Sequence, residues 1–489
     1  MVSGSSHALN DVDSFYSLIN GLPEHGTCSG TACFVASDVL MNGTAGRSER
    51  KIYCLGKCYA APAAVLKEGK FIMGVHASES VILSGIMSGP VDSLETYLER
   101  GGFSGFRRAV ELGPRGIIEA VEKSGLRGRG GAGFPTGRKW RSVYQQVSGE
   151  KYVVMNGDEG DPGSYIDRVL MEYNPYLLIE AMEIAGYAVG SNSGFAYIRI
   201  EYPHSIERFS RAIKDMEMAG LLGENVDGSG FRFNITLKRG MGSYVCGEET
   251  ALMRSIEGRR PEVSVRPPYP TERGLYGKPT LINNVETFAS IPWIMTNGPQ
   301  KYQTMGYGTS RGTKLISLNS LFRKPGIYEV EFGTKISEIV ENLGGGLKEG
   351  SIKGILLGGP LSGILTPDRF DLPLDYESLR KNGTSLGHGG FIAFSDRLPI
   401  TALMEHVARF ASDESCGKCT PCRSGSRYLH NVFHDLNSGH IHGTEDLNFV
   451  RQTVRTLEST SLCGLGTGLA EFTASALKNY SEEVEKWFR

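Results

Sequence analysis

Apolar and polar residues change their period repeatedly along the middle of the chain. Some stretches repeat apolar side chains at the spacing of one helix face, and others are short runs rich in β-branched and aromatic residues, typical of buried strands. The pattern predicts helices at 116–125, 174–190 and 205–222, and strands at 151–156, 195–200 and 231–240. Strands alternating with helices indicate an α/β layered sheet.

The flanking segments have different patterns. Residues 310–395 contain two strand-like runs, a helix at 336–343 and two further strands, which predicts a small α+β module. From about residue 398 the spacing is helical to the end, which predicts a helical bundle. Before residue 92 we expect a helix at Asp11–Asn20 and strands at 51–54 and 70–75 in a small α/β module. The predicted fold is a multidomain α/β protein with boundaries 1–92, 93–308, 309–396 and 397–489.

Length and composition agree with several soluble domains. The 489 residues exceed what one hydrophobic core holds, and 40% hydrophobic with 22% charged residues is typical of globular chains. A formal net charge of −2 predicts no bulk attraction to nucleic acid or anionic membranes. The N-terminus has no basic segment followed by an apolar one, and no apolar run approaches the roughly 18 residues of a membrane span. We therefore expect a cytoplasmic protein.

The nine cysteines are clustered, which favours metal ligation over disulfides in a cytosolic chain. Cys416, Cys419 and Cys422 are spaced by two residues, and Cys463 follows at a distance. Three thiolates of one tight loop and a fourth from another element can hold a [4Fe–4S] cubane. The alternative is zinc, although zinc sites usually pair two CxxC turns. A helix follows Cys422, so its N-terminus would lie beside the anionic cluster.

A second set of four cysteines lies near the N-terminus. Cys28 and Cys33 form one close pair, and Cys54 and Cys58 form another, each in a glycine-containing segment. Two cysteines per iron fit a [2Fe–2S] rhomb. The alternatives are a zinc site or four ordinary buried thiols.

Three polar segments accompany the central α/β pattern. The loop 128–133 matches GxGxxG, but a predicted helix precedes it, so it is not a standard dinucleotide fingerprint. Its glycines can still bring backbone N–H groups to a phosphate or a flat ring, with Lys139 nearby, although a plain glycine-rich turn remains the alternative. The segment 156–168 places acids at the carboxyl end of a strand, where α/β sheets bind ligands. Residues 242–252 and 281–288 add two glutamates and two asparagines.

Taken together and in order, six segments resemble one family. They are SGLRGRGGAGFPTGRKW, NGDEGDPGSYIDR, GSYVCGEETAL, RPPYP, GLYGKPTLINNVET and ESCGKCTPC with SLCGLG. The chain is similar in these segments, over most of 100–489, to the NADH-binding flavoprotein subunit of respiratory complex I. The same family includes the diaphorase subunits of NAD-dependent formate dehydrogenases and of NAD-reducing or bifurcating hydrogenases.

The resemblance implies FMN, NAD(H) and a [4Fe–4S] cluster. It places the FMN site at Gly128, Arg129, Gly130, Gly131, Lys139, Asn156, Asp158, Glu159, Tyr244, Gly247, Glu248, Asn283 and Asn284. It places the NADH site at Phe134, Asp161, Glu249, Arg266 and Tyr269, with the aromatic rings stacking on adenine and Glu249 facing ribose or nicotinamide. Hydride transfer between stacked rings requires no side-chain acid or base, so we expect no catalytic proton donor.

The resemblance also extends to modules and partners. It implies a ubiquitin-like β-grasp (SLBB) module for 309–396 and a fused thioredoxin-like [2Fe–2S] module at the N-terminus, shortened because only twenty residues separate Cys33 from Cys54. Expected partners are NADH/NAD⁺, a thioredoxin-like [2Fe–2S] subunit and a catalytic subunit. The DEGDPG form and the absence of a ferredoxin-like extension after Cys463 favour a formate dehydrogenase over a hydrogenase or complex I.

Departures from the family leave the charge and stacking of the NADH site in place. Arg266 and Tyr269 stand where the family carries Lys and Phe, and Asp161 follows a glycine instead of a serine. We expect Asp161 and Glu249 to disfavour the 2′-phosphate of NADPH through like-charge repulsion. If the chain is not an NADH-binding flavoprotein subunit, the alternatives are an electron-transfer scaffold without flavin and a zinc-binding structural protein.

Two remaining features have modest functional weight. His430, His434, His440 and His442 could include a metal-binding i, i+4 pair, but a solvated helix face explains them better. Cys246 lies inside one of the flavin-site segments, and we interpret it as a buried structural thiol.

Overall fold

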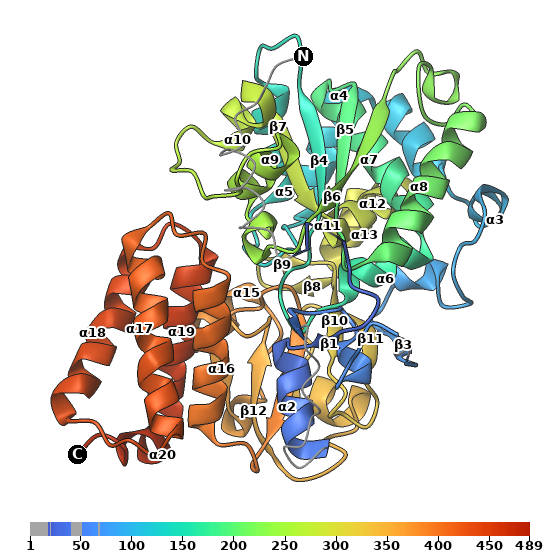
Figure 1. Ribbon diagram of the computed structural model, residues 1–489. Helices are drawn as coiled ribbons and strands as arrows, with labels where there is room; N and C mark the ends of the chain where they lie inside the picture. The colour runs from blue at the N-terminus through green and yellow to red at the C-terminus, as the bar shows by residue number, and fades with distance from the viewer. Residues whose placement is uncertain (1–17, 20, 41–50, 67–68) are drawn as a thin grey trace.

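The central domain is built on a parallel four-stranded sheet (Figure 1). A computed structural model describes residues 18–19, 21–40, 51–66 and 69–489. In the order β6-β5-β4-β7, the strands are β6 (Asn234–Gly240), β5 (Ser193–Arg199), β4 (Tyr152–Gly157) and β7 (Thr280–Asn284). The three strands predicted from the sequence are confirmed, and β7 was not predicted. The chain runs from β4 through β5 to β6 and then places β7 on the other side of β4.

Long helices pack on this sheet. The predicted helices appear as α4 (Ser104–Ser124), α7 (Pro175–Val189) and α8 (Pro203–Met218). Asn174 caps α7 by accepting from the Leu177 amide, and Gly190 ends it in the left-handed region at φ 74°. Shorter helices are α3 (Leu94–Glu99), α5 (Thr136–Tyr144), α6 (Ile166–Tyr173), α9 (Glu249–Ile256), α10 (Pro270–Arg273), α11 (Val285–Ala289), α12 (Ile291–Asn297) and α13 (Pro299–Thr304).

A mixed six-stranded sheet forms a second domain. Its order is β13-β12-β14-β10-β11-β3, with β13 (Ile364–Leu365), β12 (Ile352–Leu357), β14 (Gly390–Ser395), β10 (Thr313–Leu318), β11 (Gly326–Glu331) and β3 (Ile72–His76). The two strand-like runs predicted there form β10 and β11, which pair in antiparallel fashion. The helix predicted at 336–343 forms as α14 (Ile336–Glu338) followed by a π-helical turn, Ile339–Leu343, and α15 (Tyr376–Lys381) lies before β14.

The strand predicted at 70–75 forms as β3, but it does not complete an N-terminal module. It pairs in parallel with β11 and so extends the second sheet. The buried carboxylate of Glu329 on β11 then accepts hydrogen bonds from the amides of Val81, Ile82 and Leu83. The boundary expected at residue 92 therefore does not hold, because the sheet edge and this carboxylate recruit residues 72–83.

The N-terminal region retains little regular structure among its described residues. A two-residue parallel pair, β1 (Thr27–Cys28) with β2 (Lys51–Ile52), flanks α2 (Thr31–Leu40). The strand predicted at 51–54 ends at Ile52, since Cys54 has φ 59°. The helix predicted at Asp11–Asn20 lies almost entirely outside the described residues.

The helical bundle predicted at the C-terminus is present. It consists of α16 (Ile400–Asp413), α17 (Thr420–Asn437), α18 (Thr444–Thr460), α19 (Gly464–Asn479) and α20 (Ser481–Glu485). In Figure 1 the bundle lies beside the six-stranded sheet, below the central domain. Within the described part of the chain, no helix combines the length and apolar character needed to cross a membrane.

Candidate flavin, dinucleotide and iron–sulfur sites

A cavity of about 860 Å³ opens at the carboxyl ends of β4 and β7. This edge is the switch point of the sheet, where open α/β sheets bind ligands. Register places Asn156 opposite Asn284, so the acidic loop after β4 and the asparagine pair of β7 meet there. The second domain contributes Gly358, Ser362 and His388 to the wall, and the helical domain contributes Cys463.

Nearly all the residues predicted for FMN and NADH line this one cavity. The predicted FMN residues on its wall are Gly128, Gly130, Gly131, Lys139, Asn156, Glu159, Tyr244, Gly247, Glu248, Asn283 and Asn284. The predicted NADH residues on its wall are Phe134, Asp161, Glu249, Arg266 and Tyr269. Segments more than a hundred residues apart are thus brought to one pocket.

The polar atoms of the wall match a hydroxyl-rich anionic ligand. Thr136 Oγ1, Asp161 Oδ1, Asp167 Oδ1 and Glu248 Oε1 are buried and have no hydrogen-bond partner in the described chain. Buried polar atoms are normally paired, so such atoms on a cavity wall fit a ligand that donates hydrogen bonds. The glycine loop adds backbone N–H groups suited to a phosphate. The residues present therefore fit FMN.

The rim of the cavity suits a dinucleotide. Phe134 and Tyr269 are 48% and 52% exposed there, which leaves their rings free to stack on a base. Glu249 accepts from Lys139 Nζ at 3.3 Å and from Arg266 Nη1 at 2.8 Å. Burial opposes ionisation of Glu249, but the two cations outweigh it and lower its pKa. Glu249 is therefore an anion that can accept from ribose hydroxyls.

Two residues predicted for the FMN site lie elsewhere. Arg129 is fully buried; it donates to Tyr302 Oη at 2.7 Å and to the Arg311 carbonyl at 2.8 Å, and lies over the Phe332 ring. The glycine loop turns its side chain away from the cavity and towards the second domain. Asp158 is buried and lines a smaller neighbouring cavity of about 220 Å³, because its carboxylate lies against the side-chain-free Gly160 and Gly247.

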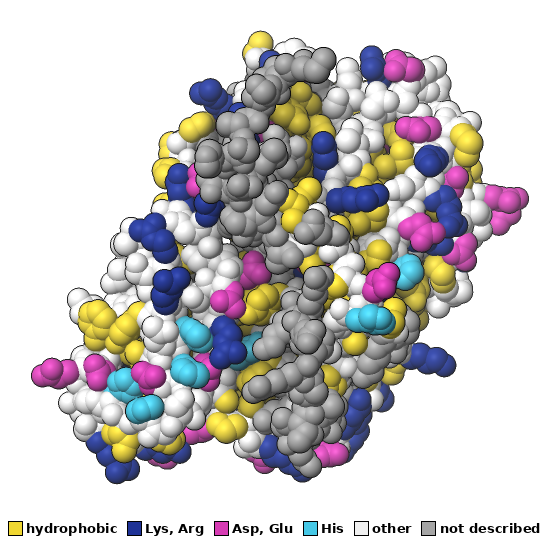
Figure 2. Space-filling model, viewed as in Figure 1, with side chains coloured by type: hydrophobic (Ala, Val, Ile, Leu, Met, Phe, Trp, Pro, Cys, Tyr) yellow, Lys and Arg dark blue, Asp and Glu magenta, His cyan; other side chains and the backbone are white. Residues whose placement is uncertain are grey.

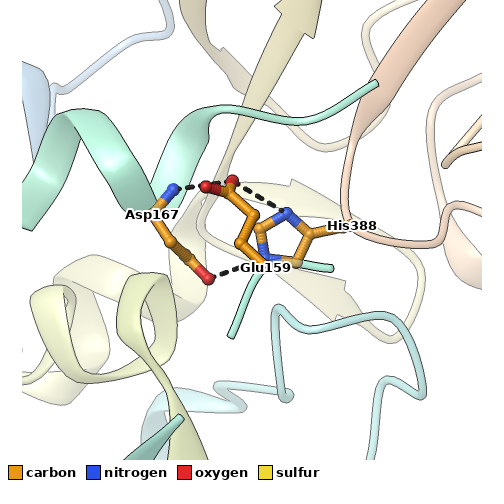
Figure 3. A group of neighbouring side chains, drawn as sticks. All are labelled: Glu159, Asp167 and His388. Atoms are coloured by element: carbon orange, nitrogen blue, oxygen red, sulfur yellow. Dashed lines mark hydrogen bonds and ion pairs between the residues drawn. The ribbon is translucent and has the colours of Figure 1, made fainter. Parts of the chain in front are cut away.

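His388 is a wall residue that sequence reasoning missed. Figure 3 shows its ring facing the carboxylates of both Glu159 and Asp167, with Nε2 3.0 Å from Asp167 Oδ2 and Nδ1 3.5 Å from Glu159 Oε1. Burial opposes the charged ring, but Asp167 and Glu159 outweigh it and raise the pKa of His388 to about 9. A charged ring has no lone pair for a metal, so this triad is an ion-paired cluster. No local sequence signal links residues 167 and 388.

The carboxylate of Glu159 is occupied by hydrogen bonds from the protein itself and is not free to bind a ligand. Its carboxylate accepts from the Asp167 and Arg168 amides, capping α6, and from the hydroxyls of Ser164 and Tyr202. Its backbone has φ 36°, an uncommon conformation for a residue with a side chain. Glu159 therefore shapes the cavity floor through a fixed geometry.

The four C-terminal cysteines come together as the spacing predicts. Cys416 and Cys419 lie close enough to Cys422 to raise the pKa of its thiol electrostatically. Cys416 and Cys422 act in the same way on Cys463. Burial is the main reason that the pKa of Cys422 rises to about 11 and that of Cys463 to about 12. Cys419 caps α17 and Cys463 caps α19, so two helix N-termini face the group. Burial by itself disfavours free thiolates, whereas the two helix N-termini favour the negative charge of a bound cluster.

The four N-terminal cysteines also meet. Cys28 contacts Cys33 and Cys54, and the sulfurs of Cys54 and Cys58 are 4.0 Å apart. Backbone amides of Gly30 and Ala63 approach the Cys28 and Cys33 sulfurs at 3.4 Å.

The spacing of both cysteine sets bears on the zinc alternative. In the described chain, no three cysteine sulfurs lie mutually within 4.8 Å. Tetrahedral zinc with bonds of about 2.3 Å would hold four sulfurs roughly 3.8 Å apart. Both sets are therefore wider than a single zinc ion requires.

The remaining histidines and Cys246 have structural explanations. Histidine side chains gather over the C-terminal helices (Figure 2), where His430 accepts from Arg409, His434 pairs with Glu405 and His442 pairs with Asp446. This is the solvated, ion-paired face expected. Cys246 is 1% exposed in a small apolar cluster, as predicted.

Comparison with known proteins agrees with this site. Residues 121–293 match the Nuo51 FMN-binding domain, and residues 402–487 match the NADH-ubiquinone oxidoreductase-F iron-sulfur binding region. The NADP-reducing hydrogenase subunit HndC of Solidesulfovibrio fructosivorans is 41% identical over 396 residues, 81% of this chain and 80% of that protein. An NADH-quinone oxidoreductase subunit of Aquifex aeolicus is 38% identical over 81% of this chain and 92% of its own length.

A solved structure matches the chain over its whole length. An NAD⁺-reducing [NiFe]-hydrogenase in the H₂-reduced state superposes with a TM-score of 0.85 and 26% identity, covering 100% of this chain and 88% of that one. These likenesses confirm the family read from the six segments. The chain belongs to the family of NAD(H)-dependent FMN and [4Fe–4S] flavoprotein oxidoreductase subunits that includes the NADH-quinone oxidoreductase subunit of Aquifex aeolicus and the hydrogenase subunit HndC.

Proposed function

We propose that this chain exchanges a hydride between NAD(H) and FMN and passes single electrons through two iron–sulfur clusters to partner subunits. The observation that carries the proposal is the cavity at the β4–β7 edge, which combines the predicted flavin residues, the predicted dinucleotide residues and Cys463 on one wall. A cluster ligand bordering the flavin pocket gives electrons a short route out. Bound FMN would supply the chemistry that joins a two-electron donor to one-electron acceptors.

The N-terminal cysteines support a [2Fe–2S] cluster as a second station. The Gly163 amide hydrogen-bonds the Cys58 thiol, and Gly163 belongs to the acidic loop whose Gly160 and Asp161 line the cavity. The four cysteines therefore lie directly behind the flavin loop, and Cys463 lies on another wall. We propose that Cys28, Cys33, Cys54 and Cys58 hold this cluster in a shortened thioredoxin-like module, and that 309–396 is an SLBB module extended by β3.

The chain's own residues bind and orient the two ligands. The glycine loop and Asn283–Asn284 would hold FMN against the strand ends, and Phe134 with Tyr269 would stack the adenine at the rim. Glu249 would accept from the ribose and repel a 2′-phosphate. Burial raises the pKa of Asp161 to about 7, so Asp161 is only partly charged near neutral pH and contributes less to this repulsion than Glu249.

Reconstitution of the full chain tests the proposal. We expect one FMN, about six iron atoms from the two cluster types, and reduction of an artificial one-electron acceptor by NADH. A matched variant, Cys54→Ser, should lose the iron of one cluster and retain FMN and NADH oxidation by the flavin. Protein that binds no flavin, or that binds zinc in place of iron, would contradict the proposal.

The partner subunit defines the terminal substrate. We propose a formate-oxidising partner; the DEGDPG loop resembles the form in formate dehydrogenase and hydrogenase diaphorases, which argues against a complex I partner. A hydrogen-oxidising partner is the second candidate, favoured by the relatives named as hydrogenase subunits. Metal analysis of the complex purified through this chain separates them: molybdenum or tungsten supports the first, and nickel supports the second.

A further inference from the structure

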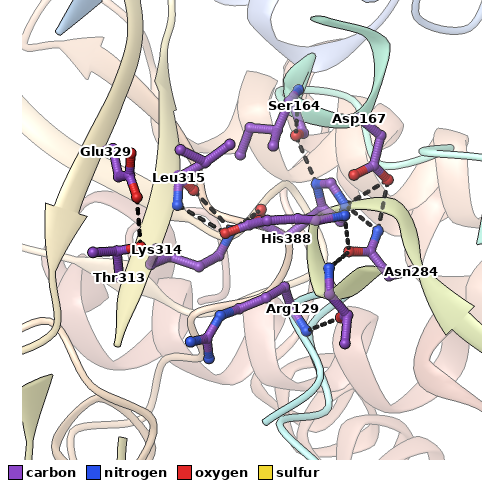
Figure 4. Close-up of polar contacts among 12 residues, drawn as sticks. Arg129, Ser164, Asp167, Asn284, Thr313, Lys314, Leu315, Glu329 and His388 are labelled. Carbon is purple, nitrogen blue, oxygen red and sulfur yellow. Dashed lines mark hydrogen bonds and ion pairs between the residues drawn. The ribbon is translucent and has the colours of Figure 1, made fainter. Parts of the chain in front are cut away.

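His388 reaches into the flavin cavity from the second domain. It lies in the loop between α15 and β14, and Figure 4 shows its ring directed at Ser164 and Asp167 of the central domain. Nδ1 is 2.7 Å from Ser164 Oγ, and Nε2 is 3.0 Å from Asp167 Oδ2. Ser164 in turn donates to Glu159, so Nδ1 donates to Ser164; Nε2 donates to Asp167 and also lies 3.0 Å from Asn284 Nδ2. A ring with two donated protons is a cation.

The charged groups around this ring come from several elements. Asp167 of α6 and Glu159 of the preceding loop are the acids that face it. Lys314 of β10 is the nearby cation; it is paired with Glu286 and also donates to the His388 carbonyl at 3.0 Å. The ring's charge offsets one of the two acids, so its loss would roughly double the negative charge at this end of the cavity.

The backbone donors of the glycine loop lie at this end of the cavity. The amides of Gly130, Gly131 and Ala132 donate to no acceptor among the described residues. A Cβ on Gly131 would lie 3.5 Å from Gly387, beside His388, and a Cβ on Gly130 would lie 3.1 Å from Asn284 Cβ. The ring of His388 therefore lies next to a row of unpaired backbone donors, the arrangement that binds phosphate.

The other cationic side chains of the cavity wall lie at the end away from the glycine loop, near Glu249 and the rim. Lys139 and Arg266 are both paired with Glu249, and Arg138 lies over Phe134 at the rim. Of the four cationic side chains described on the wall, His388 is the one beside the glycine loop.

We propose that His388 is a specificity-determining residue whose positive charge favours the phosphate of the flavin, so that the site takes FMN in preference to riboflavin. The inference rests on the proposed function, because it assumes that the cavity holds a flavin. The imidazolium offsets one of the two acids, Asp167 and Glu159, and the glycine amides supply the neutral donors. Asn284, which donates to Asp167 and caps α11, holds Asp167 in place.

The test compares FMN and riboflavin on the deflavinated full-length chain by quenching of flavin fluorescence. His388→Asn should raise the Kd for FMN at least tenfold and change the Kd for riboflavin less than twofold. His388→Lys, which restores a cation, should recover part of the loss, and His204→Asn on the exposed face of α8 should change neither. Thermal stability of each variant is measured in parallel.

The outcomes separate the two proposals. Equal losses for both flavins, or no loss for FMN, would overturn the role of His388. Wild-type protein that binds neither flavin would overturn the proposed function. If His388→Asn does not fold, the wild type still decides: its preference for FMN should decline as pH rises through about 9, where the ring loses its proton, and a preference that is constant from pH 7 to 10.5 would refute the inference.

Discussion

Replacing Glu329 by Gln tests whether residues 72–83 belong to the second domain. The carboxylate is fully buried and accepts from Ser80 Oγ, from the amides of Val81, Ile82 and Leu83, and from Thr313 Oγ1 at 2.6–3.2 Å. Gln keeps one acceptor oxygen but turns an NH₂ group towards remaining donors. Two charge-assisted bonds are lost at about 1.5–3 kcal/mol each, and part of this is offset by the easier burial of a neutral group, which leaves about 3 kcal/mol.

Hydrogen exchange at residues 81–83 measures this locally, without assuming that a multidomain chain unfolds in one step. A loss of about 3 kcal/mol corresponds to exchange about 150-fold faster. The control is Glu338→Gln, an exposed carboxylate paired with His76, which should change exchange by less than about threefold. If Glu329→Gln leaves the three amides within threefold of wild type, the carboxylate does not anchor this segment and the reasoning fails.

Four further predictions concern the site. Cys463→Ser should remove the [4Fe–4S] signal in electron paramagnetic resonance and leave FMN content unchanged; loss of both would mean that the fold depends on the cluster. Phe134→Ala should raise the KM for NADH about twofold to tenfold, from about 0.5–1.5 kcal/mol of stacking, with unchanged FMN affinity. Arg129→Met should lower the melting temperature and leave the FMN Kd within twofold, since the side chain faces Tyr302. A tenfold higher Kd would mean that the Arg129 side chain does contribute to FMN binding. Because the pKa of His388 is raised to about 9, its ion pair stabilises the fold fully below about pH 6.5 and loses this as pH rises through 9; the melting-temperature difference between wild type and His388→Asn should shrink from pH 7 to pH 10.

Much of the candidate site was readable from local patterns. Each strand-end loop of the central domain combines a buried apolar run with polar residues directly after it, and a parallel sheet brings such ends to one edge. The family resemblance placed Asn156 and Asn284, far apart in the chain, in one site, and the parallel sheet makes them register neighbours. Iron–sulfur ligation was readable for a similar reason, since cysteines two residues apart in one loop must face a common point.

The direction in which a loop side chain points could not be predicted from the sequence. Arg129 sits among residues that line the cavity, yet the glycines around it allow the backbone to turn, and its guanidinium finds Tyr302 and a carbonyl in the second domain. The same applies to Asp158, whose carboxylate occupies space left by two glycines. In both cases the choice depends on partners that local sequence does not identify.

The sequence by itself determined three strands and three long helices of the central domain, the cysteine sets and the loops that carry the polar groups, because periodicity and spacing act over a few residues. Only the tertiary structure decided that Ile72–His76 pairs with β11 and that His388 completes the flavin cavity. Both depend on contacts across more than two hundred residues, where an unpaired sheet edge and two buried carboxylates select their partners. The position of the His388 cation beside the glycine loop therefore results from the packing of two domains, and no sequence motif predicts it.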